Sequence, residues 1–395
     1  MWQKIKNLYH LFIAVSSNIL LHFPARKLIL IGVTGTDGKT TTVSLIYNIL
    51  KSSGKNVSML SSVSARIGDK EYDTGFHVTT PSPFALQKFL KKAVSKGSEY
   101  FILEVTSHAL DQQRIWGIPF KIGVLTNITS EHLDYHKSFE TYVKTKEKLL
   151  KMAEYGVVNR DDKSYASLSN AKKSKSEKHW ITYGLSKDAE LNPDKFVFES
   201  KVLLGDFNKQ NALAATAVCK ILGLEDSNIR NAIKTFKMPM GRFDYVYDKD
   251  FSVIIDFAHT PNAFDQLLSC LRKQTKGRII HVFGSAGERD SKKRSVMGKI
   301  SSNYADIIIL TAEDPRKEDV NKIIEEIESG ISNNKVEVRK IQDRSEAIKT
   351  AVGMAKASDL VLVTGKGHEK SMTFGKKDTP WDEYEAVKTA LDTRI

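Results

Sequence analysis

A short loop near the start of the chain combines glycines, hydroxyl groups and a lysine in a pattern suited to binding phosphate. Its residues are Gly35, Thr36, Asp37, Gly38, Lys39, Thr40 and Thr41. The glycines permit tight turns, so backbone amides can point at phosphate oxygens. Lys39 can neutralise charge on the β- and γ-phosphates, and the Thr40 hydroxyl is placed to ligate Mg²⁺. We therefore expect a nucleotide phosphate site at this loop.

The elements expected around the loop support this interpretation. An apolar run at 27–33 is typical of a buried strand, and a helix is expected at 39–51. The dipole of a helix N-terminus favours an anion, and a strand–loop–helix context makes such a motif credible. The general P-loop pattern needs glycine at position 33, where this chain has Val33. The loop therefore departs from the pattern of motors and GTPases.

Short apolar runs alternate with helical patterns along the rest of the chain, which predicts parallel α/β units. Before residue 236 we expect strands at 57–60, 100–105, 122–126 and 156–158, and helices at 83–95 and 139–152. The segment 161–178 is polar and rich in lysine, so we expect a surface excursion there. After residue 238 we expect strands at 253–257, 278–283, 307–311, 336–338 and 360–364, and helices at 262–271 and 320–329.

These elements predict two α/β domains with a ligand cleft between them. The first, at 28–237, is a central P-loop ATPase-type domain with a mostly parallel sheet. The second, at 238–395, is a C-terminal Rossmann-like domain. The boundary falls at 236–241, where Met-Pro-Met-Gly interrupts the pattern.

Bulk composition excludes some classes and leaves others open. The chain has 395 residues, two cysteines and a formal net charge of +13. Two cysteines cannot form a disulfide framework, which favours a reducing compartment such as the cytoplasm. The positive charge suits polyanionic partners, but charge alone does not choose between nucleotides, nucleic acid and an anionic membrane.

Residues 1–27 form an apolar segment that is flanked by Lys4, Lys6, Arg26 and Lys27. The apolar stretch is too short and too interrupted to predict a membrane span, and no signal-peptide cleavage site is evident. Two interpretations stay open: a helix packed on the first domain, or an interfacial helix on a membrane.

The sequence Gly-Thr-Asp-Gly-Lys-Thr-Thr closely resembles the phosphate loop of the Mur ligases, which usually carry Asn at the position of Asp37. The resemblance extends over nearly all of 28–395 and is closest to members that add the third residue to UDP-N-acetylmuramoyl-dipeptide. Such enzymes join an amino acid to a cell-wall peptide through an acyl-phosphate. The resemblance implies a cytoplasmic, ATP- and Mg²⁺-dependent ligase with a peptide-bearing acceptor and no nucleic-acid partner.

Within the first domain, the resemblance assigns roles to residues in four further blocks. Glu104 would bind Mg²⁺, and its expected place at a strand end beside the phosphate loop independently suits a metal ligand. His132 would be a second metal ligand, and Lys146 aligns with a lysine that the family carbamylates. Lys144 and Lys148 remain register alternatives for Lys146. The implied acceptor contacts are Thr79, Thr80 and Ser107.

The remaining motifs face ATP and the incoming amino acid in the family. Asn208, Asn211, Arg242, Asp256 and His259 would lie near ATP, although the two asparagines could equally be a helix N-cap and a turn residue. The implied contacts to the amino acid are Arg289, Glu313, Asp314, Arg316, Gly365 and Glu369. Arg316 can grip a carboxylate and Glu369 an ammonium group, which suits a diaminopimelate-like substrate. Asp314 replaces a family Asn and leaves the identity of the amino acid open.

Third-residue ligases carry a UDP-binding domain before the phosphate loop, whereas only 34 residues precede Gly35 in this sequence. These are too few for such a domain. The acceptor therefore stays open, and we expect residues 1–24 to hold the enzyme near a membrane-borne one. Alternatives are a folate-type polyglutamate ligase or cyanophycin-like synthetase, a P-loop NTPase, and a scaffold without ligase activity. The oligomeric state is left open.

Overall fold

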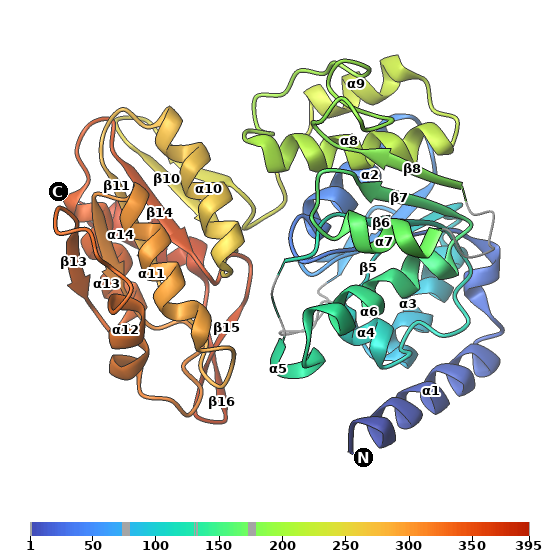
Figure 1. The fold of residues 1–395 in the computed structure, drawn as a ribbon, viewed down its shortest axis with the longest axis horizontal. Coiled ribbons are helices and arrows are strands. Elements are labelled where there is room, and N and C mark those ends of the chain that lie inside the picture. The colour runs from blue at the N-terminus through green and yellow to red at the C-terminus, as the bar shows by residue number, and fades with distance from the viewer. Residues whose placement is uncertain (1, 73–79, 130, 132, 173–178, 395) are drawn as a thin grey trace. The chain divides into compact units, whose positions relative to one another are not determined.

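The computed structural model describes residues 2–72, 80–129, 131, 133–172 and 179–394. Thr79 and His132, two of the predicted site residues, lie outside this part of the chain. The chain divides into two compact units, Met1–Lys237 and Met238–Ile395 (Figure 1). We refer to them as the N-terminal unit and the C-terminal unit.

The N-terminal unit is built on a sheet with the strand order β4-β3-β2-β5-β1-β6-β7-β8. The strands are β1 (Ile29–Thr34), β2 (Val57–Leu60), β3 (Ala65–Ile67), β4 (Lys70–Tyr72), β5 (Tyr100–Glu104), β6 (Phe120–Leu125), β7 (Tyr155–Asn159) and β8 (His179–Tyr183). All run in one direction except β3, which pairs antiparallel with both of its neighbours, β2 and β4. After β1 the chain forms β2 to β5 on one side of that strand, and it then crosses to form β6 on the other side. This topological switch point is where open α/β sheets bind ligands.

Helices cover both faces of this sheet (Figure 1). They are α1 (Trp2–Leu20), α2 (Lys39–Ser52), α3 (Pro83–Ser95), α4 (Ser107–Asp111), α5 (Leu133–His136), α6 (Phe139–Met152), α7 (Tyr165–Lys172), α8 (Asp206–Ile221) and α9 (Asp226–Lys234), with a 3-10 turn at Pro24–Lys27. Helices α2, α8 and α9 pack together, and α4, α5 and α6 form a second group. Gly32 and Gly123 allow α6 to approach closely, because a Cβ at Gly123 would lie 3.1 Å from the Leu149 carbonyl oxygen. Close packing of α6 matters because this helix carries Lys146.

The C-terminal unit contains a sheet with the order β13-β12-β11-β14-β10-β9 and a separate hairpin of β15 and β16. The strands are β9 (Asp244–Asp248), β10 (Ser252–Asp256), β11 (Ile279–Phe283), β12 (Ile307–Leu310), β13 (Glu337–Lys340), β14 (Leu360–Thr364), β15 (Ser371–Phe374) and β16 (Lys377–Pro380). Only β9 is antiparallel within the large sheet. The helices are α10 (Pro261–Gln274), α11 (Lys292–Tyr304), α12 (Val320–Glu328), α13 (Arg344–Met354) and α14 (Glu383–Asp392). The arrangement confirms the predicted α/β class and the mostly parallel sheets.

Two parts of the prediction need correction. The segment 161–178 is not a plain surface excursion, because it contains α7, whose Leu168 is buried in a cluster with Tyr142 and Leu150. A single buried leucine among polar residues gave too weak a helical pattern to recognise. The strands β3, β4, β8, β9, β15 and β16 were also missed, because each has only three to five residues and most carry several polar side chains, which gives too weak a strand pattern.

A buried ion pair fastens the helices of the C-terminal unit to its sheet. Arg344 and Glu383 are both fully buried and are joined by hydrogen bonds of 2.9 and 2.5 Å. Arg344 also donates to the carbonyl oxygens of Ala312 and Thr364, which follow or end the strands β12 and β14. The Glu383 carboxylate, helped by Glu313 and Asp314 farther away, outweighs the burial of Arg344 and raises its pKa. The pair therefore holds the carboxyl edge of the sheet.

We predict that Arg344→Met destabilises the protein by about 3–5 kcal/mol, because it leaves Glu383 buried without its cation. The matched control is Arg339→Met, which removes a half-exposed pair with Glu337 and should cost less than about 1 kcal/mol. Urea unfolding followed by circular dichroism measures both. Equal losses in the two variants would contradict the role given to Arg344.

Candidate functional site

The phosphate loop lies between the end of β1 and the start of α2, and the residues after β6 hold its backbone. The amides of Thr36 and Asp37 donate to the Asn127 carbonyl and side-chain oxygens at 2.9 and 2.8 Å. The Thr126 hydroxyl donates to the Asp37 carbonyl at 2.6 Å. Gly38 begins the helix at a φ of +79°, a conformation that favours glycine. The loop is therefore shaped before any ligand binds.

Thr40 and Glu104 meet beside this loop. The Thr40 hydroxyl donates to Glu104 Oε2 at 3.0 Å, and the same oxygen accepts from the Ser62 amide at 3.0 Å. Thr40 and Ser62 hydroxyls are also 3.0 Å apart. Both Thr40 and Glu104 are buried. The result is a group of hard oxygen atoms at the carboxyl edge, the donor type that Mg²⁺ prefers.

Lys146 reaches the loop from α6. Its side-chain nitrogen donates to the Gly35 carbonyl oxygen at 2.7 Å and lies 4.5 Å from the centre of the Tyr142 ring. Burial, and then the neighbouring Lys39 cation, hold the pKa of Lys146 well below its ordinary value, and Asp37 opposes them only partly. Lys144 and Lys148 point away: both are exposed. Of the three register alternatives, only Lys146 faces the phosphate loop.

Lys39 folds back on its own loop and donates to the Thr36 carbonyl oxygen at 2.8 Å. Its amine is partly exposed, as are Thr36, Asp37 and Gly38. The amine could therefore exchange the carbonyl contact for a stronger contact with a phosphate oxygen.

Thr80 and Ser107 lie beside the end of β5. The Thr80 hydroxyl donates to the Glu104 carbonyl oxygen at 3.1 Å, and the Thr106 amide donates to Thr80 at 3.1 Å. The Ser107 hydroxyl shares a hydrogen bond of 3.0 Å with His136 Nε2. The predicted acceptor contacts that the structure describes therefore lie beside the backbone that follows Glu104.

Asn208 and Asn211 lie inside α8 and are buried, so neither is the N-cap or turn residue that the alternative interpretation required. Asn208 donates to the Leu204 carbonyl oxygen at 3.0 Å. Asn211 packs directly behind the loop, since a Cβ on Gly38 would lie 2.3 Å from its side-chain oxygen. Both asparagines therefore support the loop and the start of α8.

In the C-terminal unit, the side chains after β10 brace the backbone. The two oxygens of Asp256 accept from the amides of Phe243 and Ala258, each at 2.6 Å. The Arg242 guanidinium stacks over the Phe257 ring at 4.5 Å. Although His259 is partly exposed, desolvation and then the Lys293 cation lower its pKa to about 3, so its imidazole is neutral near pH 7.

A cluster of charges occupies the carboxyl ends of β12 and β14. The buried Lys366 ammonium lies 2.9 Å from Asp314 and 2.5 Å from Glu369. Burial of Lys366 is outweighed by these carboxylates, Glu369 first, so the pKa of Lys366 is raised. The extra anion that Asp314 brings, compared with Asn, is therefore paired with a cation inside the unit.

Glu313 has a different environment. It is buried, and among the described residues its Oε2 atom accepts no hydrogen bond. Burial raises the pKa of Glu313 to about 7, despite the opposing cations Lys293, Arg344 and Lys366. Gly365 faces it with a φ of +108°, and a Cβ there would lie 2.5 Å from Oε2. An unpartnered, buried carboxyl at a carboxyl edge marks a place for a ligand group that can donate hydrogen bonds.

Arg316 and Arg289 lie at the margin of this cluster. Arg316 has a φ of +51°, and its guanidinium donates to the Gly287 carbonyl oxygen at 3.1 Å. Its amide donates to Thr373 of β15 at 3.0 Å, so the hairpin fixes its position. Arg289 is exposed.

Four residues with evident roles were not among the predicted site residues: Ser62, Thr126, Asn127 and Lys366. Thr126 ends an expected strand and Asn127 follows it, which was the available signal. Lys366 lies within a Gly-Lys-Gly run, but its pairing with Asp314 depends on two separate strands. Nothing in the sequence marks Ser62.

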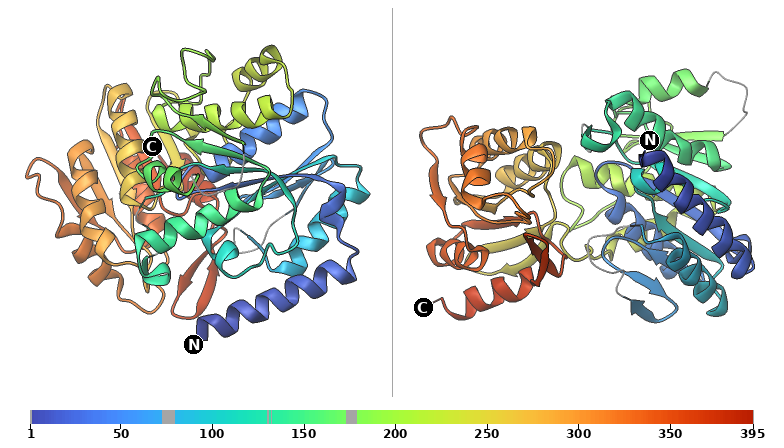
Figure 2. Two further views of the ribbon diagram at one scale, coloured as in Figure 1. Left: turned by 45° about the vertical axis from the view of Figure 1, so that its right-hand side comes forward. Right: turned by 90° about the horizontal axis from the view of Figure 1, so that it is seen from below.

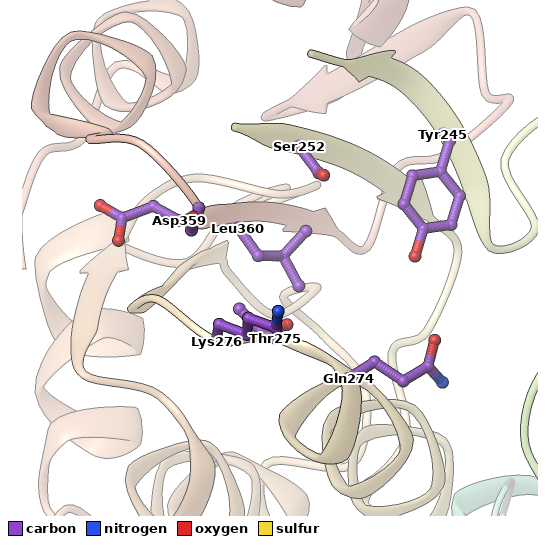
Figure 3. Close-up of a pocket in the computed structure, with 8 residues that line it drawn as sticks. Tyr245, Ser252, Gln274, Thr275, Lys276, Asp359 and Leu360 are labelled. Atoms are coloured by element: carbon purple, nitrogen blue, oxygen red, sulfur yellow. The ribbon is translucent and has the colours of Figure 1, made fainter. Parts of the chain in front are cut away.

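Figure 3 shows a separate hollow of about 210 Å³ in the C-terminal unit. It is lined by Tyr245, Ser252, Gln274, Thr275, Lys276, Ser358, Asp359 and Leu360. Ser252 and Leu360 are the first residues of β10 and β14, so the hollow lies at the amino edge of the sheet. Ligands of open α/β sheets bind at the other edge, and we assign this hollow no role.

The raised pKa of Glu313 predicts a pH-dependent stability. Because the folded-state pKa is above the unfolded value, the folded protein binds more protons between pH 4.5 and 7 and loses stability as pH rises through that window. Glu313→Gln should match the wild type at pH 5 and be more stable by roughly 2–3 kcal/mol at pH 8. Urea unfolding at both pH values tests this.

The control for Glu313 is Glu325→Gln, at an exposed position of α12, which should give the same small effect at both pH values. A Glu313→Gln effect that does not change with pH would contradict the buried, high-pKa carboxyl.

Comparisons with known proteins agree with this arrangement. Residues 33–219 match the Mur ligase middle domain, and residues 241–367 match the Mur ligase, glutamate ligase domain. The chain is 36% identical over 388 residues to the UDP-N-acetylmuramoyl-L-alanyl-D-glutamate–2,6-diaminopimelate ligase 1 of Clostridium acetobutylicum, covering 92% of this chain and 78% of that protein.

Solved structures give the same result. A structure of UDP-N-acetylmuramoyl-L-alanyl-D-glutamate–2,6-diaminopimelate ligase has a TM-score of 0.63 and 29% identity, covering 92% of this chain and 78% of the other. The folylpolyglutamate synthase of Mycobacterium tuberculosis, solved with ADP and AMPPCP, has a TM-score of 0.72 at 16% identity, covering 90% and 92%, and shows the shared fold. The domain matches and the 36% identity over most of both chains establish that this protein belongs to the Mur ligase family.

Proposed function

We propose that the protein is an ATP-dependent ligase that adds an amino acid to a cell-wall peptide precursor through an acyl-phosphate. The observation that carries this proposal is the convergence of Glu104 from β5 and Lys146 from α6 on the loop that carries Lys39 and Thr40. The family relationship supplies the reaction class.

Mg²⁺ fits the oxygen atoms beside the loop. Thr40 and Glu104 would hold it, and the bound ion would offset negative charge on the phosphates. Among the described residues there is no cluster of three His, Cys, Asp or Glu that could hold a metal ion. Further ligands would therefore come from the nucleotide, from Lys146 as its carbamate, and from His132, which enters the proposal on the sequence resemblance alone.

The protein groups of the N-terminal unit would carry the first step. Loop amides and the N-terminus of α2 hold the phosphates, and Lys39 neutralises the charge that develops as the acceptor carboxylate attacks the γ-phosphorus. ADP leaves and an acyl-phosphate remains. Thr80 and Ser107 lie next to Glu104 and would position that carboxylate.

The C-terminal unit would bind the amino acid whose amine attacks the acyl-phosphate and releases phosphate. Arg316 suits a carboxylate, and Glu369 and Glu313 suit ammonium groups. Because Lys366 pairs with Asp314, the substitution of Asp for the family Asn leaves no unpaired anion. We therefore propose the same substrate class as for the diaminopimelate-adding relatives. Arg289 and Gly365 belong to this subsite, and Asn208 and Asn211 support the ATP site. For Arg242, Asp256 and His259, a role near ATP stays a prediction from the sequence resemblance.

We assign ATP binding to residues 28–237 and amino-acid binding to residues 238–395. Within the described residues, no helix has the length and apolar character needed to cross a bilayer. We propose a cytoplasmic enzyme with a peripheral membrane contact through residues 1–24, and an acceptor that carries the muramoyl-dipeptide.

Phosphate release from ATP, with and without UDP-N-acetylmuramoyl-dipeptide and across a panel of amino acids, tests this function. We expect release only when the acceptor and a diaminopimelate-like amino acid are both present. Lys39→Ala should lower the rate by roughly 100-fold or more, because it removes a charge that stabilises the transition state. Lys51→Ala, farther along α2 and partly exposed, is the control.

If no acceptor and amino-acid pair stimulates release, the acceptor assignment is wrong. Turnover that survives in Lys39→Ala would contradict the assignment of the loop itself.

The lowered pKa of Lys146 predicts carbamylation, since the neutral amine is the form that attacks CO₂. With ¹³C-bicarbonate, the wild type should give a carbamate carbon NMR signal that Lys146→Met abolishes and Lys144→Met retains. A carbamate signal of unchanged intensity in Lys146→Met would refute the assignment.

A further inference from the structure

Helix α1 presents an apolar stripe on its outer side. Six large apolar side chains at helical spacing are 53–67% exposed: Ile5, Leu8, Tyr9, Phe12, Ile19 and Leu20. The helix packs against α3 of the N-terminal unit, and its other side faces outwards (Figure 2). A surface helix normally turns its apolar side inwards, so this orientation needs an explanation.

Three polar residues of α1, Gln3, Asn7 and Asn18, face the protein. The Gln3 amide donates to the Tyr135 hydroxyl at 2.6 Å, and the Asn7 amide donates to Asp111 Oδ2 at 3.2 Å. Asn18, fully buried, donates to the Trp116 carbonyl oxygen at 3.0 Å. These contacts fix the rotation of the helix, so that its apolar stripe is held in an outward position.

The surroundings of the stripe are cationic. No Asp or Glu occurs among residues 1–36, and the exposed side chains of Lys6, Arg26 and Lys27 lie on or just after the helix. Apolar side chains flanked by cations match the interface of a bilayer that carries anionic lipids. A second copy of the chain fits less well, because it would bring an equally cationic surface against this one.

We propose that the apolar stripe of α1 is a binding surface for the anionic face of a lipid bilayer, with the helix lying in the plane of the interface. The anchor points Tyr135 and Asp111 belong to the segments that also supply His136 and Ser107. Docking would therefore bring the acceptor side of the N-terminal unit to the membrane. That consequence rests on the proposed function, whereas lipid binding itself does not.

Flotation with two kinds of vesicle tests the proposal: phosphatidylcholine alone, and phosphatidylcholine with about 30% phosphatidylglycerol. The wild type should float with the anionic vesicles, roughly tenfold more than with the neutral ones, and less at high salt. The combined variant Leu8→Ser, Phe12→Ser, Ile19→Ser should lower the bound fraction roughly tenfold. The matched control replaces three exposed apolar residues elsewhere, Met152→Ser, Val197→Ser and Val296→Ser, and should float like the wild type.

Thermal unfolding checks that the variants fold, and Lys6→Gln with Lys27→Gln provides a second test that leaves the apolar stripe intact. This charge variant should lose the preference for anionic vesicles. The proposal is overturned if the wild type floats with neither vesicle, or if the stripe variant floats as well as the wild type. It is also overturned if sedimentation shows a wild-type dimer that the stripe variant dissociates while lipid binding is absent.

Phosphate release with a soluble acceptor separates the two proposals. The folded stripe variant should keep the wild-type rate. If the wild type floats with anionic vesicles but has no ligase activity, the lipid-binding proposal stands and only the proposed function is refuted.

Discussion

The parallel pairing of β1 with β5 and β6 is the constraint on which the N-terminal site depends. Val33 lies opposite Glu104 on one side and Val124 on the other, and Thr34 lies opposite Leu125. This register places the phosphate loop, the Glu104 carboxylate and Thr126 at one level of the sheet edge. A slip of one residue would turn Glu104 to the other face of the sheet and separate it from Thr40. The chemistry of the site thus follows from backbone hydrogen bonds made several residues earlier.

The C-terminal unit also places its charged residues at the ends of paired parallel strands, but ion pairs fix the positions of their side chains. Asp256 and Thr364 are paired at the ends of β10 and β14, so the loops after them leave the sheet together. Here the positions of the charges depend on ion pairs: Arg344 holds the strand ends, and Lys366 holds Asp314 and Glu369. Among the described residues, the Oε2 atom of Glu313 accepts no hydrogen bond, which leaves it available to a substrate group. The ion pairs of Arg344 and Lys366 therefore give the subsite its shape, and the Glu313 carboxyl is left to bind the substrate.

The parts that could be predicted from sequence are those with a local signal. The phosphate loop, the strands that precede Glu104 and the two α/β sheets all have short-range patterns, and the structure has them. Lys146 could be assigned only by resemblance, because Lys144 and Lys148 share its run; burial under the loop distinguishes it. The partner of Asp314 could not be predicted, since Lys366 is 52 residues away and meets it only through strand order. The outward orientation of the apolar side of α1 could not be predicted either. Periodicity shows that a helix has an apolar and a polar side, but not which side faces the protein.

The close approach of α6 to the sheet makes the position of Lys146 depend on two glycines, Gly32 and Gly123. Gly32 and Gly123 lie within the strands β1 and β6, and a methyl group at either would meet Leu149 at 2.8–3.1 Å and push α6 outwards. Lys146, three residues before Leu149, would move with the helix and lose its contact with Gly35. Selection for activity would therefore preserve both glycines as strictly as the charged residues. In a set of related sequences, such positions would stand out as invariant although they lie inside the sheet, away from the chemistry.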